Sequence, residues 1–206
     1  MQLARKCEVS RKAFPSLFYK FGMTKKSGNS LSKFVIILAF VFVILTVFFF
    51  VMYQIFSKSI FETLAITFGT TAYHFVMRLM VGLFIHGIFK NNFDYNKKYF
   101  QERPFEKKLY KKLKVKSWKN KMPTFIPNLF NLECNSLEKI AGAMCEAEVV
   151  HTIIVIFSFL PILAAIFFGC FWVFFITSFL SAIFDMMFII LQRFNRPRIL
   201  KMEKRL

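Results

Sequence analysis

A nearly unbroken apolar run from Val149 to Leu191 constrains the fold of this chain more than any other feature. As a single helix, its 43 residues would extend about 64 Å, roughly twice the thickness of the hydrocarbon core of a bilayer. The run must therefore fold back on itself. Gly169, near its middle, predicts two antiparallel membrane helices joined by a very short turn, so that both ends of the run emerge at the same membrane surface.

The composition indicates an integral membrane protein. A chain of 206 residues with 56% hydrophobic content and a net charge of +18 cannot hide its apolar surface in one soluble core. The apolar stretches are continuous and do not alternate with period two, so we predict an all-α, polytopic membrane protein and not a barrel. Its cysteines form no CxxC pair and no cluster with histidines, so we expect no metal site and no disulfide framework: Cys7, Cys134, Cys145 and Cys170.

Two further stretches are long enough to cross a bilayer, which gives four predicted spans near residues 34–56, 61–89, 149–168 and 170–191. The basic residues gather in three other places: an arm over residues 1–33, a loop over residues 90–148 and the tail after residue 191. The positive-inside rule then predicts that both termini and the loop face the cytoplasm, as parts of a multi-pass protein of the cell membrane. We expect residues 34–206 to form a single membrane domain.

The second predicted span carries a polar face. At about 100° per residue, one side of this helix holds Thr63, Thr67, Thr70, Thr71, His74 and Arg78. Ionisable groups inside a membrane helix are costly and usually face the bundle interior or a water-filled cavity, so His74 and Arg78 are candidate substrate-binding residues. The alternative is that Arg78 extends to the lipid headgroups and that His74 bonds a neighbouring helix.

The basic loop contains the pattern of an amphipathic helix. Pro104 can begin a helix, and Phe105, Leu109 and Leu113 recur every four residues among lysines. Attraction of these lysines to anionic lipid is one interpretation, and binding of the phosphates of an anionic co-substrate is the other. We do not expect nucleic acid as a partner, because the positive blocks flank membrane segments and no nucleic-acid-binding module is recognisable.

Local signals also mark the ends and the middle of the third span. Asn135 followed by Glu138 is typical of a helix cap with its reciprocal acid, so a helix should begin near residue 136 and continue into the membrane. Pro161 should kink this helix, because proline removes a backbone donor. Asp185 is the only carboxylate inside the fourth span, and it can line a cavity deeper in the bilayer than the end of the run.

The ends of the long run bring acids, an imidazole and guanidiniums together. Glu148 and His151 are three residues apart at one end, while Arg193, Asn195 and Arg196 follow the other end. A histidine beside a carboxylate can act as a general base toward a hydroxyl, and arginine can orient a carbonyl or a phosphate. We therefore predict His151 as the base, Glu148 as its orienting partner and the other three as substrate-binding residues. A solvated helix end is the alternative.

Three blocks in the second half of the chain carry a resemblance to known proteins. They are KLYKKLKVKSWKNKMP at residues 108–123, AEVVH at residues 147–151 and IILQRFNRPRIL at residues 189–200. These blocks resemble the YxxLxVKxWKxxxP, RAExxHW and QRYNRPRL patterns of the glycosyl-4,4'-diaponeurosporenoate acyltransferase family of bacterial membrane enzymes. Glu146 and Thr152 stand where the second pattern has arginine and tryptophan. The resemblance implies an enzyme of carotenoid biosynthesis that esterifies the sugar of a glycosylated carotenoid with a fatty acyl group. It adds Lys116 and Trp118 to the expected substrate-binding residues.

Two hypotheses for the function follow. The first is a membrane acyltransferase that moves a fatty acyl group from an anionic donor, such as an acyl-CoA used as co-substrate, onto a hydroxyl of an amphipathic glycolipid acceptor at the inner leaflet. It requires membrane lipid as surroundings and no cofactor. The second is a non-catalytic assembly or transport partner. An enzyme needs a lipid-accessible cavity at Glu148, His151 and the NRPR segment, whereas a scaffold packs those groups into closed ion pairs.

Overall fold

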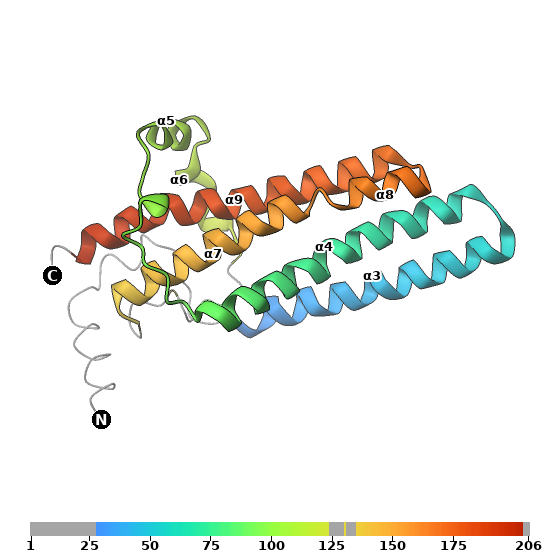
Figure 1. The fold of residues 1–206 in the computed structure, drawn as a ribbon, viewed down its shortest axis with the longest axis horizontal. Coiled ribbons are helices and arrows are strands. Elements are labelled where there is room, and N and C mark those ends of the chain that lie inside the picture. The colour runs from blue at the N-terminus through green and yellow to red at the C-terminus, as the bar shows by residue number, and fades with distance from the viewer. Residues whose placement is uncertain (1–27, 124–129, 131–134, 204–206) are drawn as a thin grey trace, which may run out of the picture. The chain divides into compact units, whose positions relative to one another are not determined.

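The computed structural model describes residues 28–123, 130 and 135–203, and these residues contain helices and no strand. In chain order the elements are α3 (Gly28–Phe56), α4 (Ser59–Phe89), η1 (Lys98–Phe100), α5 (Pro104–Lys112), α6 (Val115–Trp118), η2 (Lys119–Lys121), α7 (Leu137–Phe157), α8 (Pro161–Phe168) and α9 (Phe171–Glu203) (Figure 1). The predicted all-α class is therefore confirmed for the described part of the chain. The first 27 residues of the predicted basic arm lie outside it.

Four helical segments are long and apolar enough to cross a membrane, as predicted: residues 33–56, 59–89, 137–168 and 171–202. The third segment begins before residue 149 and the fourth continues beyond residue 191, so both are longer than the apolar run suggests. They extend because helical backbone continues through the flanking polar residues, whose acids and arginines pair with one another.

The chain divides into two compact units. The membrane unit comprises residues 33–88 and 149–187, and the loop unit comprises the described residues of 89–148 and 188–206. Each unit contains a buried ionic network of its own.

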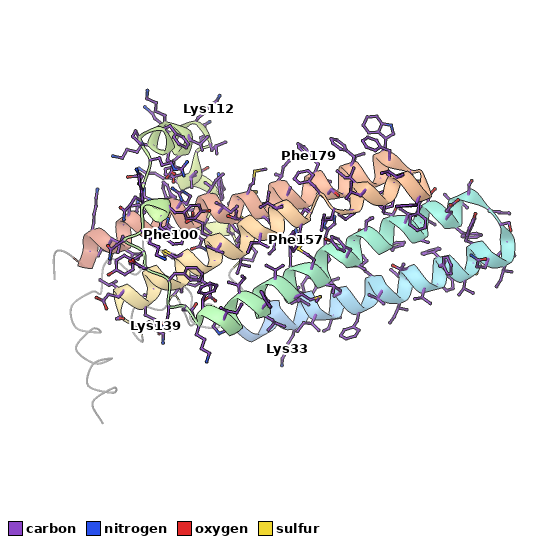
Figure 2. All side chains as sticks on the ribbon, in the orientation of Figure 1. Lys33, Phe100, Lys112, Lys139, Phe157 and Phe179 are labelled. Atoms are coloured by element: carbon purple, nitrogen blue, oxygen red, sulfur yellow. The ribbon has the colours of Figure 1, made fainter. Side chains whose placement is uncertain are left out.

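In the membrane unit, α3 and α4 form an antiparallel hairpin (Figure 1). Aromatic rings contribute to its packing, with the centroids of Phe49 and Phe68 lying 5.4 Å apart. The side chain of Thr46 in α3 packs against Gly69 of α4, where a Cβ atom would lie 3.3 Å from it. Apolar side chains project outward along α3 (Figure 2), and most of them are exposed. An apolar, exposed helix of this length is suited to contact with lipid.

The predicted reversal of the long apolar run lies between α8 and α9. Gly169 and Cys170 both have positive φ, at 64° and 47°. Glycine adopts this left-handed region without the steric cost of a side chain, which allows the helices to reverse direction within two residues.

Pro161 interrupts the third span, as predicted. α7 ends at Phe157 and α8 begins at Pro161. Because proline has no N–H, the carbonyl oxygen of Phe157 lacks its usual helical donor four residues later. The hydroxyl of Tyr73 in α4 donates to this oxygen at 3.0 Å, and Leu160 N–H donates to it at 3.1 Å. A side chain from another helix thus compensates for the missing donor.

In the loop unit, two apolar clusters join the shorter elements to α9. One packs α5 and α6 against α9 and the other packs α7 against α9: Tyr110, Val115 and Phe194 in the first, and Ile140, Met144 and Ile199 in the second. These clusters hold the C-terminal part of α9 as the central helix of the unit.

α7 begins one residue later than the capping pattern predicts. The hydroxyl of Ser136 accepts the N–H of Lys139 at 3.3 Å, and the helix starts at Leu137. Serine therefore fills the cap position that the pattern assigns to Asn135, because its hydroxyl reaches the third N–H of the helix.

Candidate active site

A histidine, an aspartate and an arginine form an ionic network inside the membrane unit. Asp185 of α9 is completely buried, and its Oδ1 lies 2.8 Å from Nδ1 of His151 in α7. Its Oδ2 accepts hydrogen bonds from Nη2 and Nε of Arg78 in α4, at 2.6 and 3.0 Å. One carboxylate is thus shared by an imidazole and a guanidinium. A carboxylate at Nδ1 fixes the tautomer and the orientation of the ring, and it makes Nε2 the basic nitrogen.

Two serines extend this network. Arg78 Nη2 donates to Ser181 Oγ at 2.8 Å, and this hydroxyl lies 3.2 Å from that of Ser158. Both serines are buried, so a continuous layer of polar groups lies among α4, α7 and α9 within the membrane unit. The layer explains how a guanidinium can lie in a span, because Asp185 compensates its charge.

The three side chains of this network differ in accessibility. The side chains of His151 and Arg78 are 21% and 19% exposed, whereas that of Asp185 is 0% exposed. The imidazole can therefore meet a substrate while the carboxylate stays shielded. A shielded carboxylate stabilises the imidazolium that forms when the ring accepts a proton.

Two buried polar side chains of the same helices have no hydrogen-bond partner among the described residues. His74, one helical turn before Arg78, is 4% exposed, and neither of its ring nitrogens has a hydrogen-bond partner among the described residues. The same holds for the hydroxyl of Ser178, three residues before Ser181. Since buried polar groups nearly always have a partner, these two side chains have donor and acceptor capacity to offer a bound molecule.

A second ionic network lies in the loop unit. Arg193 donates to Oε1 of Glu148 at 2.5 Å and to Oε1 of Glu106 at 2.5 Å. Arg196 donates to Oε2 of Glu148 at 2.6 Å, and both partners of this pair are 1% exposed. Further N–H groups of the two arginines bind backbone carbonyls of the segment before α5: Tyr99, Phe100 and Gln101. The two arginines therefore fasten this segment and α7 to α9.

This network differs from the prediction that Glu148 orients His151. Both carboxylate oxygens of Glu148 accept hydrogen bonds from arginine, and the carboxylate at Nδ1 of His151 belongs to Asp185. The physical reason is charge, because two guanidiniums bind a carboxylate more strongly than an imidazole does. Arg193 and Arg196, which the sequence predicts as a substrate clamp, hold the protein's own carboxylates and carbonyls.

The predicted amphipathic helix of the basic loop is α5, with Pro104 at its first position. Its buried residues are Glu106 and Tyr110, and the Tyr110 hydroxyl donates to Glu106 at 2.7 Å. Burial and this hydrogen bond raise the pKa of Tyr110. Phe105 and Leu113, from the predicted apolar stripe, are 56% and 41% exposed. α5 is thus held through a polar contact and leaves apolar side chains at its surface, as a helix at a lipid interface does.

The other predicted substrate-binding residues also lie in the loop unit. Lys116 is exposed, and Trp118 is half-buried with its indole N–H bound to the carbonyl of Leu113 at 3.0 Å. Trp118 packs against the cluster of Tyr110, Val115 and Phe194 and is therefore fixed in position. Asn195 is half-buried, and its Oδ1 has no partner in the described part of the chain.

Glu146, which stands in place of an arginine in the family pattern, supports the fold. Its carboxylate accepts the N–H of Asn91 at 2.5 Å, and the side chain is mostly buried. Gly142, one turn earlier on α7, leaves room for the carbonyl oxygen of Asn91, which would lie 2.5 Å from a Cβ atom there. These two positions hold the chain that follows α4 against α7.

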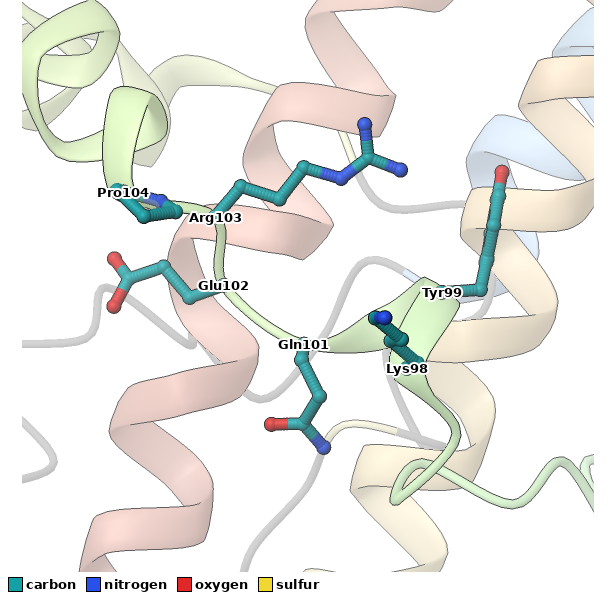
Figure 3. Close-up of a pocket in the computed structure, with 6 residues that line it drawn as sticks. All are labelled: Lys98, Tyr99, Gln101, Glu102, Arg103 and Pro104. Carbon is teal, nitrogen blue, oxygen red and sulfur yellow. The ribbon is translucent and has the colours of Figure 1, made fainter.

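A cavity of about 560 Å³ lies beside η1 (Figure 3). It is lined by Lys98, Tyr99, Gln101, Glu102, Arg103 and Pro104. Arg193 binds the carbonyls of Tyr99 and Gln101, so the ionic network of the loop unit also shapes the wall of this cavity.

Comparison with known proteins identifies one family. A family model for glycosyl-4,4'-diaponeurosporenoate acyltransferase matches residues 96–205, which is more than half of the chain. The matched part contains His151 and Asp185, as well as the arginines of the loop unit, whereas Arg78 lies outside it. No curated protein and no solved structure matches the chain.

Proposed function

Since the chain belongs to the glycosyl-4,4'-diaponeurosporenoate acyltransferase family, we propose that it is a membrane O-acyltransferase. It transfers a fatty acyl group from a thioester donor, such as an acyl-CoA, to a sugar hydroxyl of a glycosylated carotenoid or a similar glycolipid. The observation that carries this proposal is the 2.8 Å contact between His151 Nδ1 and Asp185 Oδ1. A histidine held in this way is equipped to remove a proton from a hydroxyl.

The reaction needs two proton transfers, one from the acceptor hydroxyl to His151 and one from His151 to the leaving thiol. The acceptor hydroxyl oxygen attacks the carbonyl carbon of the thioester while His151 Nε2 takes the hydroxyl proton. The new C–O bond forms, the C–S bond breaks, and the imidazolium returns the proton to the departing thiol sulfur. Asp185 stabilises the imidazolium between these two events, while Arg78 holds its other oxygen.

Groups beside the base provide contacts for the acceptor. We assign His74 and Ser178 to polar contacts with it, because both are buried and have no hydrogen-bond partner in the described part of the chain. An acceptor with an apolar polyene or acyl chain is suited to a site built between membrane helices.

The orientation in the cell membrane follows from charge. The basic loop and the basic tail favour a cytoplasmic location for the loop unit and both termini. A donor made in the cytoplasm then meets the protein from the side of the basic residues.

A non-catalytic role remains the rival hypothesis, and the loop unit favours it. Glu148, Arg193 and Arg196 form the closed ion pairs that we expect of a scaffold. The two hypotheses differ for the membrane unit, because a scaffold does not require the imidazole of His151 to accept a proton.

The test is acyl transfer by the purified full-length protein in liposomes. Glycosyl-4,4'-diaponeurosporenoate and a radiolabelled long-chain acyl-CoA are supplied, and the carotenoid ester is quantified. We expect His151→Ala to lower turnover by roughly 100-fold to 10,000-fold, the range that general acid-base catalysis contributes. His151→Gln should be no better, because an amide does not accept a proton at neutral pH.

His86→Ala is the matched control, because it removes an exposed imidazole of α4. It should keep turnover within about twofold of the wild type. Wild-type protein that forms no ester, while its loss abolishes the pigment in cells, would support the scaffold. Activity that persists in well-folded His151→Ala protein would refute the assignment of the base.

A further inference from the structure

The cavity beside η1 has the size of a binding site and is built by one short segment of the chain. Its volume is about 560 Å³. Pockets that hold small molecules typically have about 300–1,000 Å³. All of its lining residues lie between Lys98 and Pro104, within the loop unit. We call it the η1 cavity (Figure 3).

Two cationic side chains of the η1 cavity have no partner in the described part of the chain. Neither the ammonium of Lys98 nor the guanidinium of Arg103 forms a hydrogen bond or an ion pair there. Arg103 differs in this respect from Arg193 and Arg196, whose guanidiniums bind carboxylates of the protein itself. The donors of Lys98 and Arg103 can therefore serve a bound anion.

One carboxylate, that of Glu102, also lines the η1 cavity. It lies 3.8 Å from Nζ of Lys107, and its side chain extends from the loop in the direction opposite to the guanidinium of Arg103 (Figure 3). The hydroxyl of Tyr99, which can donate as well, has no partner among the described residues. The lining thus has two cations against one carboxylate, and its side-chain donors suit a negatively charged ligand.

The backbone of this segment is fixed by the ionic network of the loop unit. Arg193 donates to the carbonyls of Tyr99 and Gln101 at 3.1 and 3.0 Å, and Arg196 donates to that of Phe100 at 2.7 Å. The side-chain amide of Gln101 donates to two carbonyls of the preceding loop, at 3.2 and 3.3 Å. The frame of the cavity is therefore ordered before a ligand binds, which favours affinity.

Exposed apolar side chains begin next to the η1 cavity. Phe105 directly follows Pro104 and is 56% exposed, and Leu113, two turns further along α5, is 41% exposed. Exposed lysines lie between them on the same helix. A molecule with an anionic group in the cavity can place an acyl chain along these apolar side chains, so the surroundings suit an amphiphile.

We propose that the η1 cavity binds the phosphate group of an amphiphile, with Lys98 and Arg103 as its cationic contacts and Tyr99 as a further donor. The phosphate belongs to the nucleotide part of the acyl donor or to the headgroup of an anionic lipid. The first source rests on the proposed function, whereas the second does not. A planar guanidinium offers parallel donors to two phosphate oxygens, and an ammonium offers donors to a third.

The test is isothermal titration calorimetry of the full-length protein in a neutral detergent. Coenzyme A without an acyl group is one probe. Dihexanoyl phosphatidylglycerol is the other, with the zwitterionic dihexanoyl phosphatidylcholine for comparison. Lys98→Gln and Arg103→Gln should each weaken the binding of the active probe roughly tenfold, as the loss of one charge-assisted hydrogen bond does. Binding should also weaken as salt is added.

Two further variants separate this site from a general attraction of anions. Lys108→Gln is the matched control, because it removes an exposed charge of the loop unit that does not line the cavity. Its affinity should stay within about twofold of the wild type. Glu102→Gln removes the carboxylate of the lining and should tighten binding by about twofold to fivefold, a gain that a misfolded variant does not produce.

The outcomes also distinguish the two sources of the phosphate. Binding of coenzyme A that depends on Lys98 and Arg103 would assign the cavity to the donor, and the same dependence with phosphatidylglycerol alone would assign it to a lipid. If neither probe binds, or if Lys108→Gln weakens binding as much as Arg103→Gln does, the phosphate site is refuted. Binding is measured without turnover, so wild-type protein that binds coenzyme A but forms no ester would refute the proposed function and leave this site standing.

Discussion

Replacement of Asp185 by asparagine should affect both catalysis, through its contact with His151, and stability, through its contact with Arg78. The side chain contacts His151 through one oxygen and Arg78 through the other, at 2.8 and 2.6 Å. The asparagine amide keeps the shape and loses the charge. Without that charge the imidazolium is no longer stabilised, so turnover should fall by roughly 100-fold to 10,000-fold, the full contribution of a general base. The assay is ester formation in liposomes, with the exposed Asp94→Asn as the matched control.

The same substitution should destabilise the protein, because it leaves the guanidinium of Arg78 without its counter-charge. Removal of one partner from a buried ion pair costs about 3–5 kcal/mol. Since the Arg78 side chain is 19% exposed, the lower end of this range applies, at about 3 kcal/mol. The change can be measured as the shift of the thermal unfolding midpoint in detergent, followed by tryptophan fluorescence.

The double variant Arg78→Gln with Asp185→Asn tests whether the two tasks are separate. Removal of both charges together leaves no uncompensated ion, so stability should return to within about 1 kcal/mol of the wild type. Turnover should stay low, because His151 still lacks the carboxylate. Recovery of both properties in the double variant would show that Asp185 only supports the fold. Turnover within about threefold of the wild type in Asp185→Asn would refute the orienting role outright.

Three further predictions concern the scaffold. Gly142→Ala should lower the unfolding free energy by about 1–3 kcal/mol, because the new methyl group would meet the backbone oxygen of Asn91 at 2.5 Å. Gly82→Ala is the control, because its methyl group meets nothing within 4 Å and should be neutral or stabilising. Equal effects of the two variants in urea unfolding would contradict the close approach at Gly142. Tyr73→Phe should cost about 1 kcal/mol through the loss of its hydrogen bond to Phe157, and an unchanged unfolding midpoint would show that this contact contributes nothing. A cysteine in place of Lys58 should react with an impermeant maleimide from outside intact cells, and labelling from the cytoplasm alone would reverse the proposed topology.

Much of the fold could be predicted because its signals are local. The length of the apolar run requires a reversal, Gly169 marks its position, and Pro161 marks the break between α7 and α8. The ends of α7 and α9 were harder to predict, because the apolar run that indicates a membrane helix stops at the first polar residues. The helices continue through those residues, since Glu148 and the arginines of α9 compensate one another's charge.

The partners in the two ionic networks depend on contacts between helices, which sequence spacing does not contain. Glu148 and His151 are three residues apart and share one face of α7, so helical periodicity favours them as a pair. Helical periodicity predicts the face of the helix on which a side chain lies. It does not predict which side chains of other helices contact that face. Here α9 brings Asp185 to the imidazole and two arginines to Glu148.

Charge compensation within the spans is the signal that identifies the network of the membrane unit. Arg78 is the only lysine or arginine of the second span, and Asp185 is the only carboxylate of the fourth, so each requires a counter-charge at its own depth from another helix, because the opposite charges on its own helix lie two or more turns away. Pairing the two brings α4 against α9 without any knowledge of the structure. His151, the one ionisable group in the third span beyond Glu148, then has Asp185 as the nearest available acid within the bilayer. Because Arg78 already compensates the charge of Asp185, this carboxylate can also orient the imidazole of His151 without the cost of burying an unpaired charge. The pairing with arginine is therefore what allows a general base and its carboxylate to lie inside a membrane.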